Sequence, residues 1–239
     1  QYKKVIKIQE QIHSPDHPRF DDAINILGKL YLTIGRYDDG YPYLERSLET
    51  RKKIYPPGHA WIANALLSFG HISAEVGKYA EGLAHLETSL ALRQKRDGPD
   101  HFRTAIAYTT LGYIQHLVGQ NRTAHDTLEC ARAIFQTQQV DTRNHALVLA
   151  YLGDALISLG DLETARLHLQ NAFEIRQRID GMKHMRMGIT RVVMGTLEEA
   201  TGHPEEALAH YQAAHDIFEG VVAPTHRYYV RAENALERA

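Results

Sequence analysis

Histidine is the residue type that first suggests chemistry, because 15 histidines among 239 residues is a high count. Zinc sites use imidazole, but they need three or four ligands at matched short spacings. The most regular histidines lie about 42 residues, or a multiple of that, apart: His17, His59, His101, His184 and His226. This spacing is too wide for one ion, and each residue precedes an apolar helical segment. We therefore expect turn and capping residues, and no metal site.

Catalytic motifs are also missing from the sequence. There is no G-x-S-x-G nucleophile turn, no H-E-x-x-H and no phosphate-binding loop, since Gly77-Lys78 is not followed by Ser or Thr. Cys130 sits beside a small-residue position of a helix, which favours a packed small hydrophobe over a reactive thiol. We expect no enzyme, no catalytic residue and no cofactor.

The composition is that of a folded protein without a strong electrostatic field. Charged residues make up 23% and hydrophobic residues 44%, and the net charge is −2. This balance favours neither nucleic acid nor an anionic membrane as a partner. The single cysteine excludes an internal disulfide and fits a reducing compartment, so a cytoplasmic location is expected. Because the chain starts without Met, we expect a fragment whose parent continues on at least one side.

The elements that must position any site follow from two series of glycines. The first series ends Leu-Gly-like pairs, and the second follows it by seven residues: Gly28, Gly70, Gly112, Gly153 and Gly195, then Gly35, Gly77, Gly119, Gly160 and Gly202. Both series advance in steps of 42, 42, 41 and 42 residues. Such a fixed period is the sequence signature of a solenoid of stacked repeats.

Each repeat reads as two antiparallel helices. In the second repeat, apolar residues recur at helical spacing over 61–76 and again over 79–92, and Gly77 allows the turn between them. A glycine within a helix costs about 1 kcal/mol relative to alanine, so Gly70 must serve close packing. Small residues lie twelve positions later, on the second helix: Gly40, Gly82, Ala124, Ala165 and Ala207.

The order Leu27-Gly28-x2-Tyr31, then Ala207-x3-Tyr211, resembles the tetratricopeptide signature. The 42-residue period and the stretch 93–101, which contains Gly-Pro-Asp-His, are similar to repeats of kinesin light chains and of nephrocystin-like and NLR-type proteins. The resemblance implies an all-α fold: a right-handed α-solenoid of helix-turn-helix units with about twelve helices.

We expect one array over residues 1–239. Residues 1–14 read as the second helix of a preceding repeat, and residues 226–239 as the start of a further repeat or a capping helix. Five full repeats lie between them: 17–58, 59–100, 101–142, 143–183 and 184–225.

The resemblance places a concave peptide groove along the first helix of each repeat. The groove positions lie six and three residues before the Leu-Gly glycine, and one and four after it. The strongest candidates at these positions are Asn25, Lys29, Asn64, Leu67, His71, Ile106, Thr109, Tyr113, His116, Leu147, Asp154 and Ile189. Thr196 and Glu199 occupy the same register in the fifth repeat.

Two functions fit this pattern. The first is a scaffold that binds a peptide or protein segment in the groove. The alternative is a sensor, regulatory or oligomerisation segment of a larger NLR-like protein that contacts its own parent domains. The second asparagine of the kinesin-light-chain groove is replaced, for example by Ile26 and Ser68, so cargo specificity is not expected to carry over. The oligomeric state is not predicted.

Overall fold

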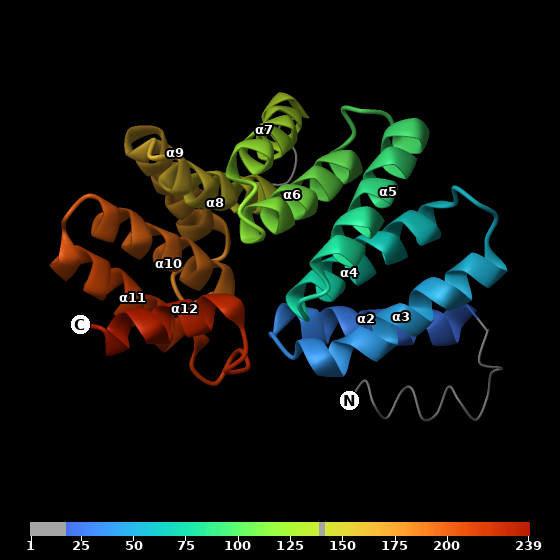
Figure 1. Ribbon diagram of the computed structural model, residues 1–239, viewed down its shortest axis with the longest axis horizontal. Helices are drawn as coiled ribbons and strands as arrows, with labels where there is room; N and C mark the ends of the chain where they lie inside the picture. Colours follow the sequence, from blue (N-terminus) through green and yellow to red (C-terminus); the bar gives the residue numbers. More distant parts are fainter. Residues whose placement is uncertain (1–17, 139–141) are drawn as a thin grey trace. The chain divides into compact units, whose positions relative to one another are not determined.

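The computed structural model describes residues 18–138 and 142–239, which form eleven helices and no strand (Figure 1). The helices are α2 (Pro18–Thr33), α3 (Tyr37–Ile54), α4 (Ala60–Glu75), α5 (Tyr79–Asp97), α6 (Phe102–Leu117), α7 (Asn121–Gln138), α8 (Thr142–Leu159), α9 (Leu162–Ile179), α10 (Met185–Ala200), α11 (Pro204–Phe218) and α12 (Arg227–Glu237). The all-α prediction is confirmed. The helix expected over 1–14 lies outside the described residues.

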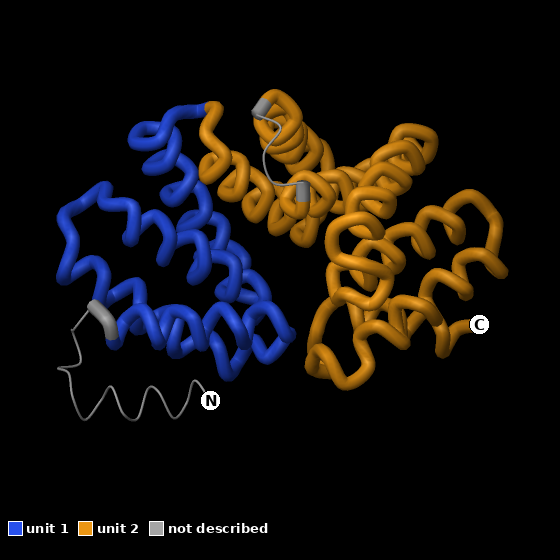
Figure 2. Tube along the Cα trace, turned by 180° about the vertical axis from the view of Figure 1, so that it is seen from behind, with its two compact units in different colours: residues 1–99 blue, residues 100–239 orange. Residues whose placement is uncertain are grey.

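The chain divides into two compact units, residues 1–99 and 100–239 (Figure 2). Unit 1 holds two helix pairs, α2 with α3 and α4 with α5. Unit 2 holds three pairs, α6 with α7, α8 with α9 and α10 with α11, followed by α12. Each pair corresponds to one sequence repeat. The assignment of the whole chain to a single array stays a prediction.

Glycine makes the turn inside each pair, as the sequence predicts. Gly77 has φ +88°, a left-handed conformation that only glycine adopts without strain. Its N–H donates to the Ala74 carbonyl at 3.0 Å, and the Lys78 N–H donates to the Ser73 carbonyl at 2.8 Å. These bonds satisfy the last carbonyls of α4 and reverse the chain. The other glycines of that series also have positive φ.

Three of the recurring histidines cap first helices with their side chains, whereas His226 makes no such bond at the start of α12. The Nδ1 atoms of His59, His101 and His184 accept from the backbone N–H two residues later, at 3.3, 3.2 and 3.2 Å. A helix N-terminus leaves these N–H groups without backbone acceptors, so the imidazole supplies one. The prediction that these three are capping residues is confirmed.

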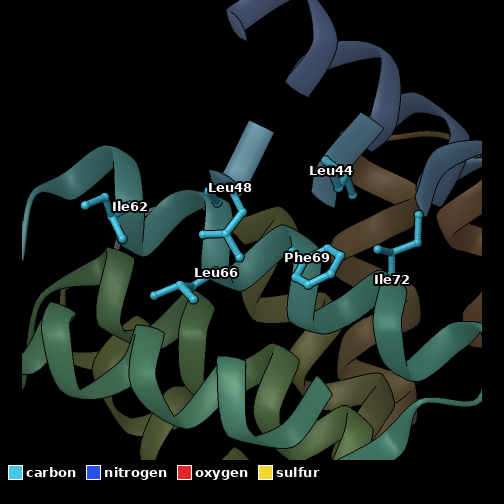
Figure 3. Packing of buried hydrophobic residues seen from close by; sticks show 7 residues of the cluster. Leu44, Leu48, Ile62, Leu66, Phe69 and Ile72 are labelled. Carbon is cyan, nitrogen blue, oxygen red and sulfur yellow. The ribbon is translucent and has the colours of Figure 1, made fainter. Parts of the chain in front are cut away.

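Apolar residues at helical spacing pack α3 against α4 in unit 1 (Figure 3). The cluster comprises Leu44, Leu48, Ile62, Ala65, Leu66, Phe69 and Ile72, all buried. Cys130 does not share this behaviour. It is exposed on α7, whereas its neighbour Ala131 faces the core. The prediction of a packed Cys130 was therefore wrong, because adjacent helical positions point about 100° apart.

The glycines within the first helices mark the closest helix contacts. A Cβ added at Gly70 would lie 2.8 Å from the carbonyl oxygen of Gly82, and one added at Gly82 would lie 2.7 Å from that of Gly70. The two backbones of α4 and α5 therefore touch where neither residue has a side chain. Elsewhere the nearest atoms belong to a side chain, as Leu44 does for Gly28.

We expect Gly70→Ala to destabilise unit 1 by about 2 kcal/mol, because the backbone of α5 cannot yield to the added methyl group. Gly28→Ala is the matched control. Its methyl group meets the flexible end of Leu44, and alanine favours the helix, so its loss should be smaller. Urea unfolding followed by fluorescence of Trp61, the single tryptophan and part of unit 1, measures both variants. Equal losses would contradict the backbone contact.

Candidate functional site

The first helices of unit 2 form one continuous layer. α6 packs on α8, α8 on α10 and α10 on α12, whereas the described residues of α7, α9 and α11 make no such contacts with one another. A stack whose first helices touch and whose second helices spread apart curves toward the first helices. We call the face formed by α6, α8, α10 and α12 the inner face. It holds a cavity of about 400 Å³.

A pair of opposite charges spans the inner-face cavity. Arg231 on α12 donates from NH1 to Oδ2 of Asp154 at 2.7 Å and from NH2 to Oδ1 at 2.8 Å. The same NH2 donates to Oγ1 of Thr196 at 2.8 Å. Asp154 is buried, with a side chain only 4% exposed, and Arg231 is 33% exposed. Three first helices, α8, α10 and α12, are thereby joined at one point.

The electrostatics of this pair explain its charge state. Burial alone would raise the pKa of Asp154, but the charge of Arg231 and hydrogen bonding from His116 and Arg231 hold it well below its ordinary value. Burial would lower the pKa of Arg231, whereas the Asp154 carboxylate raises it. Both side chains are therefore ionised at neutral pH.

His116 on α6 continues the network. Its Nε2 lies 3.6 Å from Oδ2 of Asp154, and its Nδ1 lies 2.8 Å from Oδ1 of Asn121. Burial opposes the protonated imidazole, but the Asp154 carboxylate outweighs it and raises the pKa of His116. Because folding raises the pKa of His116, protonated His116 adds stability below its ordinary pKa of about 6.5. This stability is lost as the pH rises through the raised pKa of the folded state.

A second set of hydrogen-bonded side chains, from α10 and α11, lines the cavity. The Tyr211 hydroxyl donates to Oε2 of Glu199 at 2.7 Å and lies 3.1 Å from Oγ1 of Thr196. Burial and the adjacent Glu199 carboxylate raise the pKa of Tyr211 to about 12. The phenol therefore stays protonated and acts as a donor. Arg238 reaches the other Glu199 oxygen at 3.5 Å.

Aromatic rings form the apolar part of the inner face. Tyr113 on α6 is buried and stacks on Tyr151 of α8, with ring centroids 4.6 Å apart and an interplanar angle of 20°. Tyr228 on α12 lies 6.5 Å from Tyr113 on a nearly parallel plane. Offset stacking of this kind is favourable beyond area burial alone. The predicted groove residue Tyr113 is thus part of a ring stack inside the protein.

The other predicted groove residues of unit 2 differ in exposure. Thr109 and Ile189 are buried, and the Thr109 hydroxyl donates to the Ala105 carbonyl at 2.8 Å. Ile106 and Leu147 are half-buried. Of the predicted residues in this unit, the structure brings His116 and Asp154 together in the cavity lining.

In unit 1, the predicted asparagines contact their own second helix. Asn25 is buried and donates from Nδ2 to Oγ of Ser47 at 3.2 Å. The side-chain oxygen Oδ1 of Asn64 accepts from NH2 of Arg93. Both amides therefore tie a first helix to its partner.

Three further predicted residues of unit 1 are accessible to different degrees. Lys29 as a whole residue is exposed, but the surrounding protein partly desolvates its ammonium group. This desolvation, with the positive charges of Arg51 and Arg93, lowers the pKa of Lys29. His71 and Leu67 are half-buried, and Nε2 of His71 lies 3.6 Å from Oε1 of Glu75. Their role in binding stays a prediction.

Sequence reasoning missed the residues that α12 contributes. Arg231 follows Ile189 by 42 residues, and Arg238 follows Thr196 by 42, so both occupy predicted groove positions of a sixth repeat. Extending the repeat register by one step would have found them. The role of the Tyr211 hydroxyl was also missed, because its register predicted only a large packing residue.

The inner-face cavity is suited to binding. It presents both signs of charge, a phenol donor and aromatic rings, whereas the described residues contain no group of three or more His, Cys, Asp or Glu that could hold a metal ion. No helix among the described residues is long and apolar enough to cross a membrane.

Comparison with family models decides the family. The tetratricopeptide-repeat models match residues 21–54, 61–137 and 144–220, which is most of the chain. The chain belongs to the tetratricopeptide-repeat family. Such repeat scaffolds are generally not enzymes.

Solved structures share the tetratricopeptide solenoid fold at low sequence identity. BtubC (BKLC) from P. vanneervenii is 17% identical with a TM-score of 0.66, over 92% of this chain and 89% of that one. A putative kinesin light chain repeat protein from Podosopora anserina is 18% identical with a TM-score of 0.61, over 86% of this chain and 96% of that one. A Rap protein complexed with competence and sporulation factor is 15% identical with a TM-score of 0.70, over 99% and 66%. No curated protein matches the sequence.

Proposed function

We propose that this protein is a non-enzymatic interaction scaffold of the cytoplasm and that the inner face of unit 2 binds a peptide or protein segment. The observation that carries the proposal is the 400 Å³ cavity, whose lining includes the predicted groove residues His116, Asp154, Thr196 and Glu199 together with side chains of α12. His116, Asp154 and Thr196 lie on the first helices of three successive repeats, so an extended segment in the cavity would run across the stack of first helices.

The chemistry of the lining supports a peptide as the occupant. Backbone amides need both donors and acceptors, and Asn234, Thr196 and Glu199 supply them around an apolar wall that includes Leu117 and Val230. The solenoid fold adds support, because the similar Rap protein was crystallised with competence and sporulation factor. The tetratricopeptide family itself is one of interaction scaffolds.

Site-specific photocrosslinking tests the proposal. A peptide selected by display on the wild-type protein is incubated with two variants that carry benzoylphenylalanine in place of one exposed apolar residue. Val230 on α12 lines the cavity, and Leu167 on α9 does not, so the second position is the matched control. We expect the peptide to crosslink to position 230 and not to position 167, and only on illumination.

In a competition control with labelled peptide, an excess of unlabelled peptide should remove the crosslink at position 230. Equal or stronger crosslinking at 167 would place the partner on another face and overturn the proposal. Retained helical circular dichroism in both variants excludes unfolding as the cause of a difference.

A further inference from the structure

A second cavity of unit 2, of about 280 Å³, is formed by α7, α8 and α9, away from the inner-face lining. We call it the outer cavity. Its polar side chains come from all three helices: Arg132, Gln136, His145, His168, Asn171 and Arg178. None of them was a predicted groove residue, and none lines the inner-face cavity.

Several of these side chains make no hydrogen bond within the protein, although Nε2 of His168 lies 4.0 Å from Oε1 of Glu129. Among the described residues, the imidazoles of His145 and His168, the Asn171 amide and the Arg178 guanidinium make no hydrogen bond. The two imidazoles are half-buried and Asn171 and Arg178 are exposed. Their N–H donors line one cavity and are accessible to an acceptor from outside.

Arg132 is different, because its contacts fix it at the wall of the outer cavity. Its Nε donates to Glu129 at 2.9 and 3.0 Å and its NH2 at 2.7 Å. Its NH1 donates to the side-chain oxygen Oε1 of Gln136 at 2.8 Å, which leaves the side-chain NH2 group of Gln136 as a further donor. Arg132 is a positioned charge rather than a mobile one.

The outer cavity has few acceptors. Its lining includes one carboxylate, that of Glu174, which is exposed and accepts from Gln170 at 3.5 Å. We propose that the outer cavity binds an oxyanion group of a ligand, with Arg178, Asn171 and the two imidazoles as its donors. An oxyanion presents several acceptor oxygens at once, and guanidinium groups bind it by charge-assisted hydrogen bonds.

The charges around the two imidazoles give this site a pH dependence. Burial, the Arg132 charge and His168 lower the pKa of His145. Burial lowers the pKa of His168, with Arg132 and His125 acting in the same direction and Glu129 and Asp161 opposing them. Glu174 and Arg178 also face the cavity from α9. Both imidazoles are therefore neutral at pH 7, and a bound anion favours their protonated forms, so affinity rises as the pH falls.

Sulfate is the probe of choice, because its charge stays constant through the histidine range. Titration of the full chain with sulfate at constant ionic strength in chloride is followed through the imidazole NMR signals, which His145→Gln and His168→Gln assign. We expect saturable shifts at both imidazoles and an affinity about tenfold higher at pH 5.5 than at pH 7.5. Shifts that chloride reproduces fully would overturn the proposal.

Matched arginine variants test the donor set. Arg178→Gln removes a charged donor and should weaken sulfate binding about tenfold. Arg103→Gln removes a comparably exposed arginine of α6 outside the cavity and should leave binding unchanged. Equal binding by wild type and Arg178→Gln would overturn the assignment.

Titrations with inorganic phosphate and with acetate then distinguish which oxyanion group of a ligand the cavity binds. A response to phosphate assigns a phosphoryl group, and a response to acetate alone assigns a carboxylate. The peptide crosslinking at Val230 is unaffected by either result.

Discussion

Replacing Arg231 by methionine is expected to lower the free energy of unfolding of unit 2 by about 3 kcal/mol at pH 7. Methionine keeps the apolar contacts of the arginine stem but leaves the Asp154 carboxylate, 4% exposed, without its two-point partner. His116 alone, at 3.6 Å, cannot replace two hydrogen bonds at 2.7 and 2.8 Å. Hydrogen exchange of α8, α10 and α12 amides measures the loss within this unit.

The matched control is Arg238→Met on the same helix. Arg238 is 66% exposed and lies 3.5 Å from Glu199, so its loss should stay within about 0.5 kcal/mol. The double variant Asp154→Leu/Arg231→Met should lose less than the sum of the two single variants, because it leaves no unpaired buried charge. Equal losses for Arg231→Met and Arg238→Met would show that the pair contributes nothing.

The pH dependence of the Arg231→Met deficit follows from the same pair. In the wild type, the lowered pKa of Asp154 gives stability that is present above about pH 3.8 and is lost as the pH falls through the folded-state value. In the variant, burial raises the pKa of Asp154 instead, so protonation relieves the unpaired charge. The deficit relative to wild type should therefore shrink between pH 7 and pH 4.5.

The fold was largely predictable from the sequence because each repeat needs glycine at two positions, for two different physical reasons. Gly77 must adopt positive φ, and Gly70 must lack a side chain where it meets Gly82. Neither requirement depends on distant residues, so both appear as a regular pattern. The capping histidines follow the same logic, since each one bonds a backbone N–H two residues away.

The sequence predicted where the candidate site lies, but not whether its side chains are already paired within the protein. The repeat register places Asp154 and His116 on first helices, and both line the inner-face cavity. Whether Asp154 faces an empty groove or a partner depends on Arg231, 77 residues later. Such a contact depends on how tightly successive repeats curve, and local periodicity carries no information on curvature. The outer cavity was missed for the same reason, because its donors come from three helices.

Buried arginines of the second helices are a further feature that periodicity left out. Arg51, Arg93 and Arg176 lie 23 residues after the glycines of their repeats, and phenylalanine, at Phe135 and Phe218, takes this position in the other two. All five side chains are buried. Because arginine takes this position in three repeats and phenylalanine in two, a hydrophobicity pattern does not identify it, although the side chain is buried in all five.

Arg51→Met is expected to destabilise unit 1 by about 3–5 kcal/mol, the largest loss among these substitutions. The Arg51 Nε donates to Oδ2 of Asp21 at 2.6 Å, and the two side chains are 2% and 4% exposed. The other oxygen of Asp21 has no hydrogen bond among the described residues. Removing Arg51 therefore leaves a buried carboxylate with no donor, and it also frees the Trp61 carbonyl that NH1 reaches at 3.3 Å.

Trp61 fluorescence during urea unfolding reports this loss within unit 1, because the Arg51 guanidinium lies 5.0 Å from the Trp61 ring centroid. Lys52→Met, an exposed cation next along α3, is the control and should change stability by less than about 0.5 kcal/mol. The double variant Asp21→Leu/Arg51→Met separates two causes. If it recovers most of the loss, the cost lies in the unpaired carboxylate. A double variant no more stable than Arg51→Met would instead assign the cost to lost packing of the arginine stem, and the ion-pair explanation would fail.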